Sequence, residues 1–282
     1  MISGLWREAK RANASGAHST ENDAPERAHR ASVGKLLVEY QPIVSARSGV
    51  LTGAEAIARS NAEPGVLAMP DFETAFNDGC ANLARWQCCT PDKVALSIDI
   101  STDQLLDDRF VPLVARGIRQ HAIQPARIRF EMREPAARDV TASFVTRLSV
   151  LRRMGIAVVL DDFGLKHSTL SSLIALPVSG LKFCRQFTES LPHDSTSAAI
   201  LQSVVSLARD LGISVAVDGV ENPSQLAWLA RFGDLDAQGN LISGPLSSTA
   251  LLHWLLRSPG VSAPIRRGGQ IASERLLRAP AQ

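Results

Sequence analysis

The chain has 282 residues, a mass of 30.3 kDa, 45% hydrophobic residues and a formal net charge of +2. The apolar content suffices for a sizeable core, and the near-neutral charge gives no strong electrostatic reason to bind nucleic acid or an anionic membrane. Without an apolar run of about 18 residues the sequence predicts no membrane-spanning helix, and cysteines that lack paired Cys-x-x-Cys spacing favour a reducing, cytoplasmic location over a zinc site.

The two ends of the chain differ in composition from its middle. Residues 1–34 are polar and lack periodicity, and residues 259–282 combine structure-breaking Pro and Gly with four arginines. We expect a flexible N-terminal tail, a folded domain over residues 35–258 and a flexible basic C-terminal tail. The basic tail raises the question of DNA binding, but the low net charge and the lack of a helix-turn-helix pattern argue against direct nucleic-acid binding.

The middle of the chain alternates between strand and helix patterns. Predicted strands span residues 36–44, 50–57, 94–101, 127–132, 156–162, 179–184, 213–218 and 235–236, and predicted helices span 71–87, 103–120, 139–154, 168–175, 196–211, 223–232 and 248–257. A turn at Arg47-Ser48-Gly49 makes the first two strands a hairpin. Apolar strands without alternation are buried on both faces, which is typical of parallel sheets. The pattern predicts an α/β fold, a modified TIM-type β/α barrel with one antiparallel strand.

Polar side chains stand at the end of almost every predicted strand. They are Gln41, Glu55, Asp99, Glu131, Asp161, Asp162, Lys182, Asp218, Glu221 and Gln238. A charged group at the tip of an apolar strand costs desolvation energy unless it has a partner. Any one of them could be a solvated strand end or half of a salt bridge. Because functional residues of such barrels lie at the C-terminal strand ends, the whole series indicates one site.

The motifs around these residues carry a resemblance to a known family. Glu55-Ala56-Ile57 is followed by Leu160-Asp-Asp-Phe-Gly164, Leu181-Lys182, Asp218-Gly-Val-Glu221 and Gln238-Gly239, and preceded by Tyr40-Gln-Pro-Ile-Val44. In order and spacing these segments, over about residues 36–257, resemble the EAL-domain family of cyclic di-GMP phosphodiesterases and their degenerate regulatory relatives. The resemblance implies the EAL fold, cyclic di-GMP as a ligand and, in active members, phosphodiester hydrolysis.

The resemblance also implies roles for individual residues. Glu55, Asp99, Glu131 and Asp161 would hold one Mg²⁺ or Mn²⁺ ion, and Asp162 and Asp218 would contribute to a second. Lys182 would orient water or neutralise phosphate, Glu221 and Gln238 would complete the site, Arg59 would clamp a phosphate or guanine, Gln41 would line the floor, and Glu134 would anchor the loop after Asp162. Carboxylate oxygens suit these hard cations, which can activate water and stabilise charge.

Several positions depart from the family pattern. The family has Asn where Asp99 stands and Glu where the shorter Asp218 stands, and metal sites tolerate distance errors of only about 0.2 Å. The family loop Thr-Gly-Tyr-Ser is here Leu165-Lys166-His167-Ser168, and an acid is replaced by Cys184. Two family aromatics are replaced by Ser60 and Asn240. Because catalysis requires every group in place whereas binding requires only some, we expect weak or absent hydrolysis with ligand binding retained.

The expected function is therefore that of a degenerate, stand-alone EAL-domain regulator. It would bind cyclic di-GMP, a regulatory protein partner or both. In this way it would control gene expression, as a repressor or as a regulator of virulence or motility. The alternative that stays open is an active Mg- or Mn-dependent phosphodiesterase producing linear pGpG, because both substituted metal positions, Asp99 and Asp218, are still acids. A homodimer is a further expectation from the family, whose members often pair through the loop that differs here.

Overall fold

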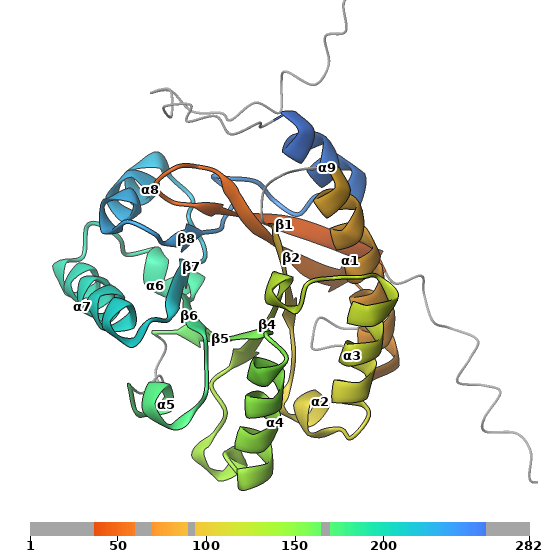
Figure 1. Ribbon diagram of the computed structural model, residues 1–282. Coiled ribbons are helices and arrows are strands. Elements are labelled where there is room, and N and C mark those ends of the chain that lie inside the picture. Colours follow the sequence, from red (N-terminus) through yellow and green to blue (C-terminus); the bar gives the residue numbers. More distant parts are fainter. Residues whose placement is uncertain (1–36, 60–68, 90–93, 165–169, 258–282) are drawn as a thin grey trace, which may run out of the picture. The chain divides into compact units, whose positions relative to one another are not determined.

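A closed barrel of eight strands in chain order forms the centre of the described structure (Figure 1). The computed structural model describes residues 37–59, 69–89, 94–164 and 170–257. The strands are β1 (Leu37–Ser45), β2 (Leu51–Arg59), β3 (Ala95–Asp99), β4 (Ile128–Arg133), β5 (Ala157–Phe163), β6 (Gly180–Phe183), β7 (Ser214–Val217) and β8 (Asp236–Ala237). β1 runs antiparallel to β2 and β8, and the other neighbours are parallel. The predicted barrel with one antiparallel strand is confirmed.

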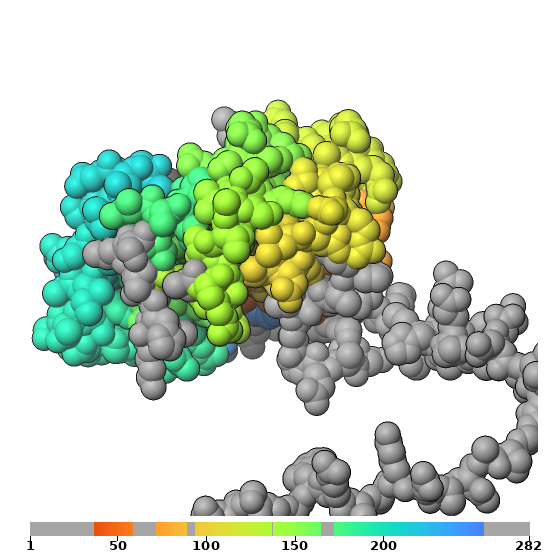
Figure 2. All heavy atoms as spheres, turned by 90° about the horizontal axis from the view of Figure 1, so that it is seen from below, coloured from red at the N-terminus to blue at the C-terminus, as the bar shows by residue number. Residues whose placement is uncertain are grey.

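Helices surround this barrel on the outside. They are α1 (Met69–Cys89), α2 (Thr102–Leu106), α3 (Phe110–Gln120), α4 (Ala142–Arg153), α5 (Leu170–Ala175), α6 (Arg185–Thr188), α7 (Ser195–Leu211), α8 (Pro223–Leu229) and α9 (Ser248–Arg257). In the space-filling view α2 to α4, yellow to light green, and the turquoise region of α7 form parts of one face (Figure 2). Within the described residues, no helix combines the length and the apolar character that crossing a membrane requires.

Aromatic side chains fill much of the layer between the helices and the barrel. Phe72 and Phe76 of α1, Phe110 of α3 and Phe130 of β4 form a cluster with ring centroids 5.3 to 6.4 Å apart. The fully buried Trp86 packs edge-on against Tyr40 of β1 at 4.9 Å. Edge-to-face aromatic pairs stabilise such layers beyond the area they bury. The cluster fixes α1 and α3 against β4, one of the strands that carry the polar series.

Local capping signals set several helix boundaries. The side chains of Thr141, Asp194 and Asn222 accept hydrogen bonds from backbone N–H groups in the first turns of α4, α7 and α8. Gly212 ends α7 in the left-handed conformation, with φ at 68°. These residue types are favoured at helix ends because they satisfy backbone groups that lack an intrahelical partner.

The helix predicted over residues 103–120 is wrong as a single element. The chain forms α2 and α3 instead, because Asp107 adopts an extended conformation with ψ at 128°. Its carboxylate accepts a hydrogen bond from the backbone N–H of Arg109 at 2.8 Å, which competes with continuing the helix. The short helix α6 directly after β6 was not predicted. Both predicted tails and residues 168–169 of the helix predicted over residues 168–175 lie outside the described residues.

Gly239→Ala should destabilise the protein strongly. Gly239 has φ at 149°, and an added Cβ would lie 2.3 Å from both the backbone N and O of Val220. Backbone atoms cannot move aside as side chains do, so we expect a loss of roughly 3 kcal/mol or more in the free energy of unfolding. Gly212→Ala is the matched control, because no atom lies within 4 Å of its added Cβ, and only the left-handed backbone penalty of about 1 kcal/mol applies. Urea unfolding that finds equal losses would contradict this account.

Candidate functional site

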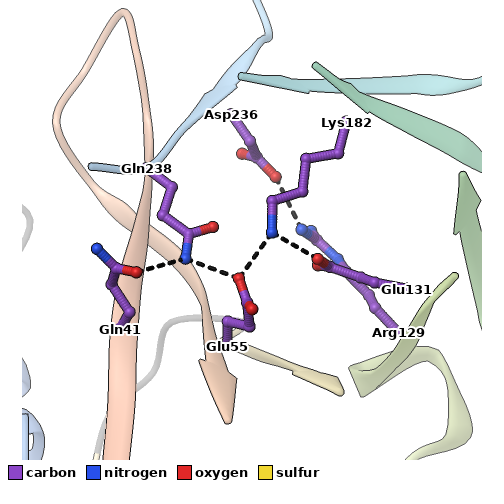
Figure 3. A network of polar contacts seen from close by, with 7 residues as sticks. All are labelled: Gln41, Glu55, Arg129, Glu131, Lys182, Asp236 and Gln238. Carbon is purple, nitrogen blue, oxygen red and sulfur yellow. Dashed lines mark hydrogen bonds and ion pairs between the residues drawn. The ribbon is translucent and has the colours of Figure 1, made fainter. Parts of the chain in front are cut away.

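The site lies in the barrel interior, toward the end where the C-termini of the parallel strands meet. Glu55 of β2 is level with Gln41 of the antiparallel β1, and Asp99 of β3 is level with Glu131 of β4. Side chains at alternate positions of a strand share a face. Figure 3 shows Gln41, Glu55, Glu131, Lys182 and Gln238 pointing toward one another from five strands or strand ends. The structure thus brings together residues spread over nearly 200 positions of sequence.

A buried ammonium group joins two of the carboxylates. Lys182 Nζ lies 2.6 Å from Glu55 Oε2 and 2.6 Å from Glu131 Oε2, and the Lys182 and Glu131 side chains are only 5% and 3% exposed. Burial by itself would lower the pKa of Lys182, but the charges of Glu131 and Glu55 raise that pKa well above its usual value. Burial likewise opposes ionisation of Glu55, yet the Lys182 ammonium and Gln238 hold the Glu55 pKa below its usual value. Lys182 is therefore charged at neutral pH.

Two glutamines extend the network to β1. Gln238 Nε2 donates to Glu55 Oε2 at 2.8 Å and to Gln41 Oε1 at 3.1 Å, and Gln41 Nε2 donates to the carbonyl of Ser243 at 3.2 Å. Gln238 is 2% exposed, and its Oε1 atom has no hydrogen-bond partner within the described part of the chain. A buried acceptor without a partner is costly. This oxygen is suited to accept a hydrogen bond from a bound water or ligand.

Three carboxyl groups converge closely enough to hold a cation. Glu55, Asp99 and Glu131 each offer an oxygen, and these oxygens lie within 4.8 Å of one another. Burial of the carboxyl, together with the charges of Glu55 and Glu131, raises the pKa of Asp99 to about 8. Burial also raises the pKa values of Glu131, Asp161 and Asp218, against the opposing charge of Lys182. Such a concentration of negative charge favours binding of a cation.

The remaining acids of the series are arranged differently. Asp162 has a positive φ of 56° and lies at an irregularity in the β5–β6 pairing. Its carboxylate forms an ion pair with Arg133, with 2.9 Å between Asp162 Oδ2 and Arg133 Nε. Glu221, which follows β7, pairs with Arg185 of α6. Bulges near functional sites commonly redirect a side chain, and here the Asp162 carboxylate is directed toward Arg133.

Two further site residues were predicted: Glu134 as the anchor of the loop after Asp162, and Arg59 as the clamp for a phosphate or guanine. Glu134 accepts a hydrogen bond from the hydroxyl of Ser172 in α5, the helix that follows the loop after Asp162. This contact is compatible with the anchoring role expected for Glu134. Arg59 is the last residue of β2. Its side chain and the loop 165–168 lie outside the described part of the structure, so their roles stay predictions.

Sequence reasoning missed the arginines that act as partners. Arg133 pairs with Asp162, Arg185 pairs with Glu221, and Arg129 Nη1 lies 2.8 Å from Asp236 Oδ2 (Figure 3). A signal for two of them was present, because Arg129, Glu131 and Arg133 occupy alternate positions of β4 and so share a face. The partner of each arginine comes from another element and could not be read from the local pattern.

Three of the acidic residues fit a divalent cation. Glu55, Asp99 and Glu131 supply convergent oxygen ligands of the kind that Mg²⁺ and Mn²⁺ prefer. A bound divalent ion would supply Lewis acidity and lower the pKa of a bound water. Lys182 holds the two glutamates together and can neutralise an anionic ligand, while Gln41 and Gln238 can orient one through their amides.

The family model described as EAL domain matches residues 25–245, and this chain belongs to the EAL-domain family. The cyclic di-GMP phosphodiesterase RocR of Pseudomonas aeruginosa is 30% identical over 236 residues, which cover 78% of this chain and 60% of RocR. Other curated relatives are longer, and this chain spans only 30% to 34% of their length.

Solved structures agree with this family assignment. The PaMucR phosphodiesterase in complex with c-di-GMP superimposes with a TM-score of 0.67 at 30% identity, covering 77% of this chain and 94% of that chain. The manganese/cyclic di-GMP complex of Klebsiella pneumoniae BlrP1 gives a TM-score of 0.65 at 25% identity, covering 75% of this chain and 56% of that chain. RocR and PaMucR are thus named as phosphodiesterases, and the BlrP1 structure contains manganese and cyclic di-GMP.

Asp99→Asn should remove part of the pH dependence of stability in metal-free protein. The folded-state pKa of Asp99, about 8, lies above its ordinary value of 3.8. The folded state therefore keeps a proton that the unfolded state releases, and this contribution is full below about pH 4 and lost as the pH rises through about 8. The Asp99 residue as a whole is exposed although its carboxyl group is packed among the other acids, so water screens part of the effect. Urea unfolding in EDTA across this range should give a flatter profile for Asp99→Asn than for wild type, and identical profiles would contradict the assignment.

Proposed function

We propose that this chain binds cyclic di-GMP at the C-terminal mouth of its barrel, hydrolyses it weakly or not at all, and acts as a regulator through a protein partner. The observation that carries the proposal is the continuous network from Gln41 through Gln238, Glu55 and Lys182 to Glu131. It presents amide groups and a buried cation, which are groups able to recognise an anionic dinucleotide. The regulatory output, in gene expression, virulence or motility, follows from the family's degenerate members.

Weak hydrolysis is supported by the state of the second group of acids. Asp162 and Glu221 are each paired with an arginine, and Asp218 is one methylene shorter than the glutamate of the family. Each displaced group can reduce transition-state stabilisation, and every 1.4 kcal/mol or so lost lowers the rate about tenfold. Ligand binding depends on fewer of these groups and should tolerate the changes better.

The alternative is an active phosphodiesterase that produces linear pGpG with Mg²⁺ or Mn²⁺. The convergence of Glu55, Asp99 and Glu131 oxygens within 4.8 Å favours it. A site able to hold even one divalent cation can polarise a phosphodiester and activate water. The two functions share ligand and site, so they differ in a measurable rate rather than in the place of binding.

The first experiment combines a long incubation with a binding measurement. We expect purified protein with cyclic di-GMP and excess Mn²⁺ to leave the nucleotide intact by chromatography, while calorimetry detects binding. Gln238→Ala should weaken that binding about tenfold, because it removes an amide from the network. Glu73→Ala, on the exposed surface of α1, is the control that should bind as wild type does. Linear dinucleotide that Glu55→Ala abolishes would support the alternative, and no binding would contradict the proposal.

A double substitution tests whether the wild-type site is impaired. Asp99→Asn with Asp218→Glu restores the residue types of the family at both positions, and lengthens the side chain at position 218 by one methylene. We expect hydrolysis at least tenfold above wild type, equivalent to about 1.4 kcal/mol of transition-state stabilisation. Product formation under Mn²⁺ is the measurement. A double variant no faster than wild type would show that these two positions do not limit the rate.

A further inference from the structure

The Arg133 guanidinium lies beside Asp162, where the family resemblance leads us to expect a second divalent cation. Arg133 lies two residues after Glu131 on β4, so the two side chains leave the same face of the strand. Its backbone is level with Asp161 of β5 in the parallel pairing. The strand register, and not only a side-chain rotamer, therefore places a guanidinium beside the Asp161-Asp162 pair at the barrel mouth.

The contact of Arg133 is with an acid expected to bind metal. Arg133 Nε lies 2.9 Å from Asp162 Oδ2. The strained backbone at Asp162, with φ at 56°, fixes the direction of this carboxylate. A divalent cation beside that oxygen would compete with the permanently charged Arg133 guanidinium for the same carboxylate.

The acids of the site differ in whether their carboxylate oxygens are available to bind a cation. Within the described ranges, Glu55, Asp99 and Glu131 form the one group of three such ligands whose donor atoms converge within 4.8 Å. Lys182 contacts only Oε2 of each glutamate, which leaves the other oxygens and Asp99 for a cation. Of the remaining acids, Asp162 and Glu221 form ion pairs with Arg133 and Arg185. The chain therefore offers one cluster of three convergent carboxyl groups, whereas Asp162, which was expected to bind the second cation, already has a cationic partner.

We infer that the Arg133 guanidinium takes the place of a second divalent cation beside Asp162, so that this chain binds a single divalent cation, in the Glu55–Asp99–Glu131 cluster. The Arg133 side chain is 85% exposed, so its terminal N–H groups remain open to an anion while Nε holds Asp162. A guanidinium binds phosphate oxygens through paired N–H donors. That second role, contact with a ligand phosphate, rests on the proposed function, whereas the cation count does not.

The test is a Mn²⁺ titration of the metal-stripped full chain, without nucleotide, followed by calorimetry and by electron paramagnetic resonance of free Mn²⁺. Wild type should bind one Mn²⁺ per chain, and Arg133→Ser should bind a second. Arg133→Lys keeps the charge and should stay at one. Arg138→Ser removes another highly exposed arginine, paired with Asp139 at 3.7 Å, and should also stay at one.

The titration separates this inference from the proposed function, because no cyclic di-GMP is present. Exposed ion pairs contribute little to stability, so Arg133→Ser should unfold at the same urea concentration as wild type. Wild type binding two Mn²⁺ ions, or none, would overturn the inference, and so would an Arg133→Ser variant that remains at one. A correct cation count with no cyclic di-GMP binding would leave the inference standing and remove the proposed function.

Discussion

The buried ammonium of Lys182, held between Glu55 and Glu131, is the interaction on which the rest of the site depends. It joins β6 to β2 and β4 across the barrel interior, at 2.6 Å from each carboxylate. Removing one partner from a buried ion pair typically costs about 3–5 kcal/mol, because the other charge is left without compensation. The strands must therefore close with these side chains at one level, and that closure places Gln238 and Asp99 beside them.

A second polar layer in the barrel supports the first. Arg129 of β4 reaches Asp236 of β8, and Asp236 also accepts a hydrogen bond from Thr52 of β2 at 2.8 Å. β8 has only two residues and few ladder hydrogen bonds of its own. Because Asp236 and Gln238 lie two residues apart, fixing Asp236 constrains the direction of Gln238. The ion pair thus connects the closure of the barrel to the geometry of the Gln238 amide.

The balance between acidic groups and internal cations in the site bears on whether the chain binds or cleaves its ligand. The described site gathers at least seven acids at one mouth and pairs several of them with Lys182, Arg133 and Arg185. Such internal cations stabilise the acids and can attract a phosphate, but they cannot polarise a water as a metal ion does. Under the proposed function, a site built in this way would recognise an anionic dinucleotide and cleave it weakly or not at all.

The sequence by itself determined the barrel, the antiparallel first strand and the strands on which Glu55, Asp161 and Lys182 lie, because periodicity and motif order are local properties of the chain. The placement of these residues at strand ends was not predicted correctly, since Glu55 lies in the middle of β2. Features that depend on a single residue were not predicted. The extended backbone at Asp107 divides a predicted helix into α2 and α3, and α6 begins only two residues after the end of β6. Only the tertiary structure decided that Arg133 pairs with Asp162 and Arg185 with Glu221. Those partners lie on different elements, and an ion pair forms only where strand register and backbone direction bring the two groups together.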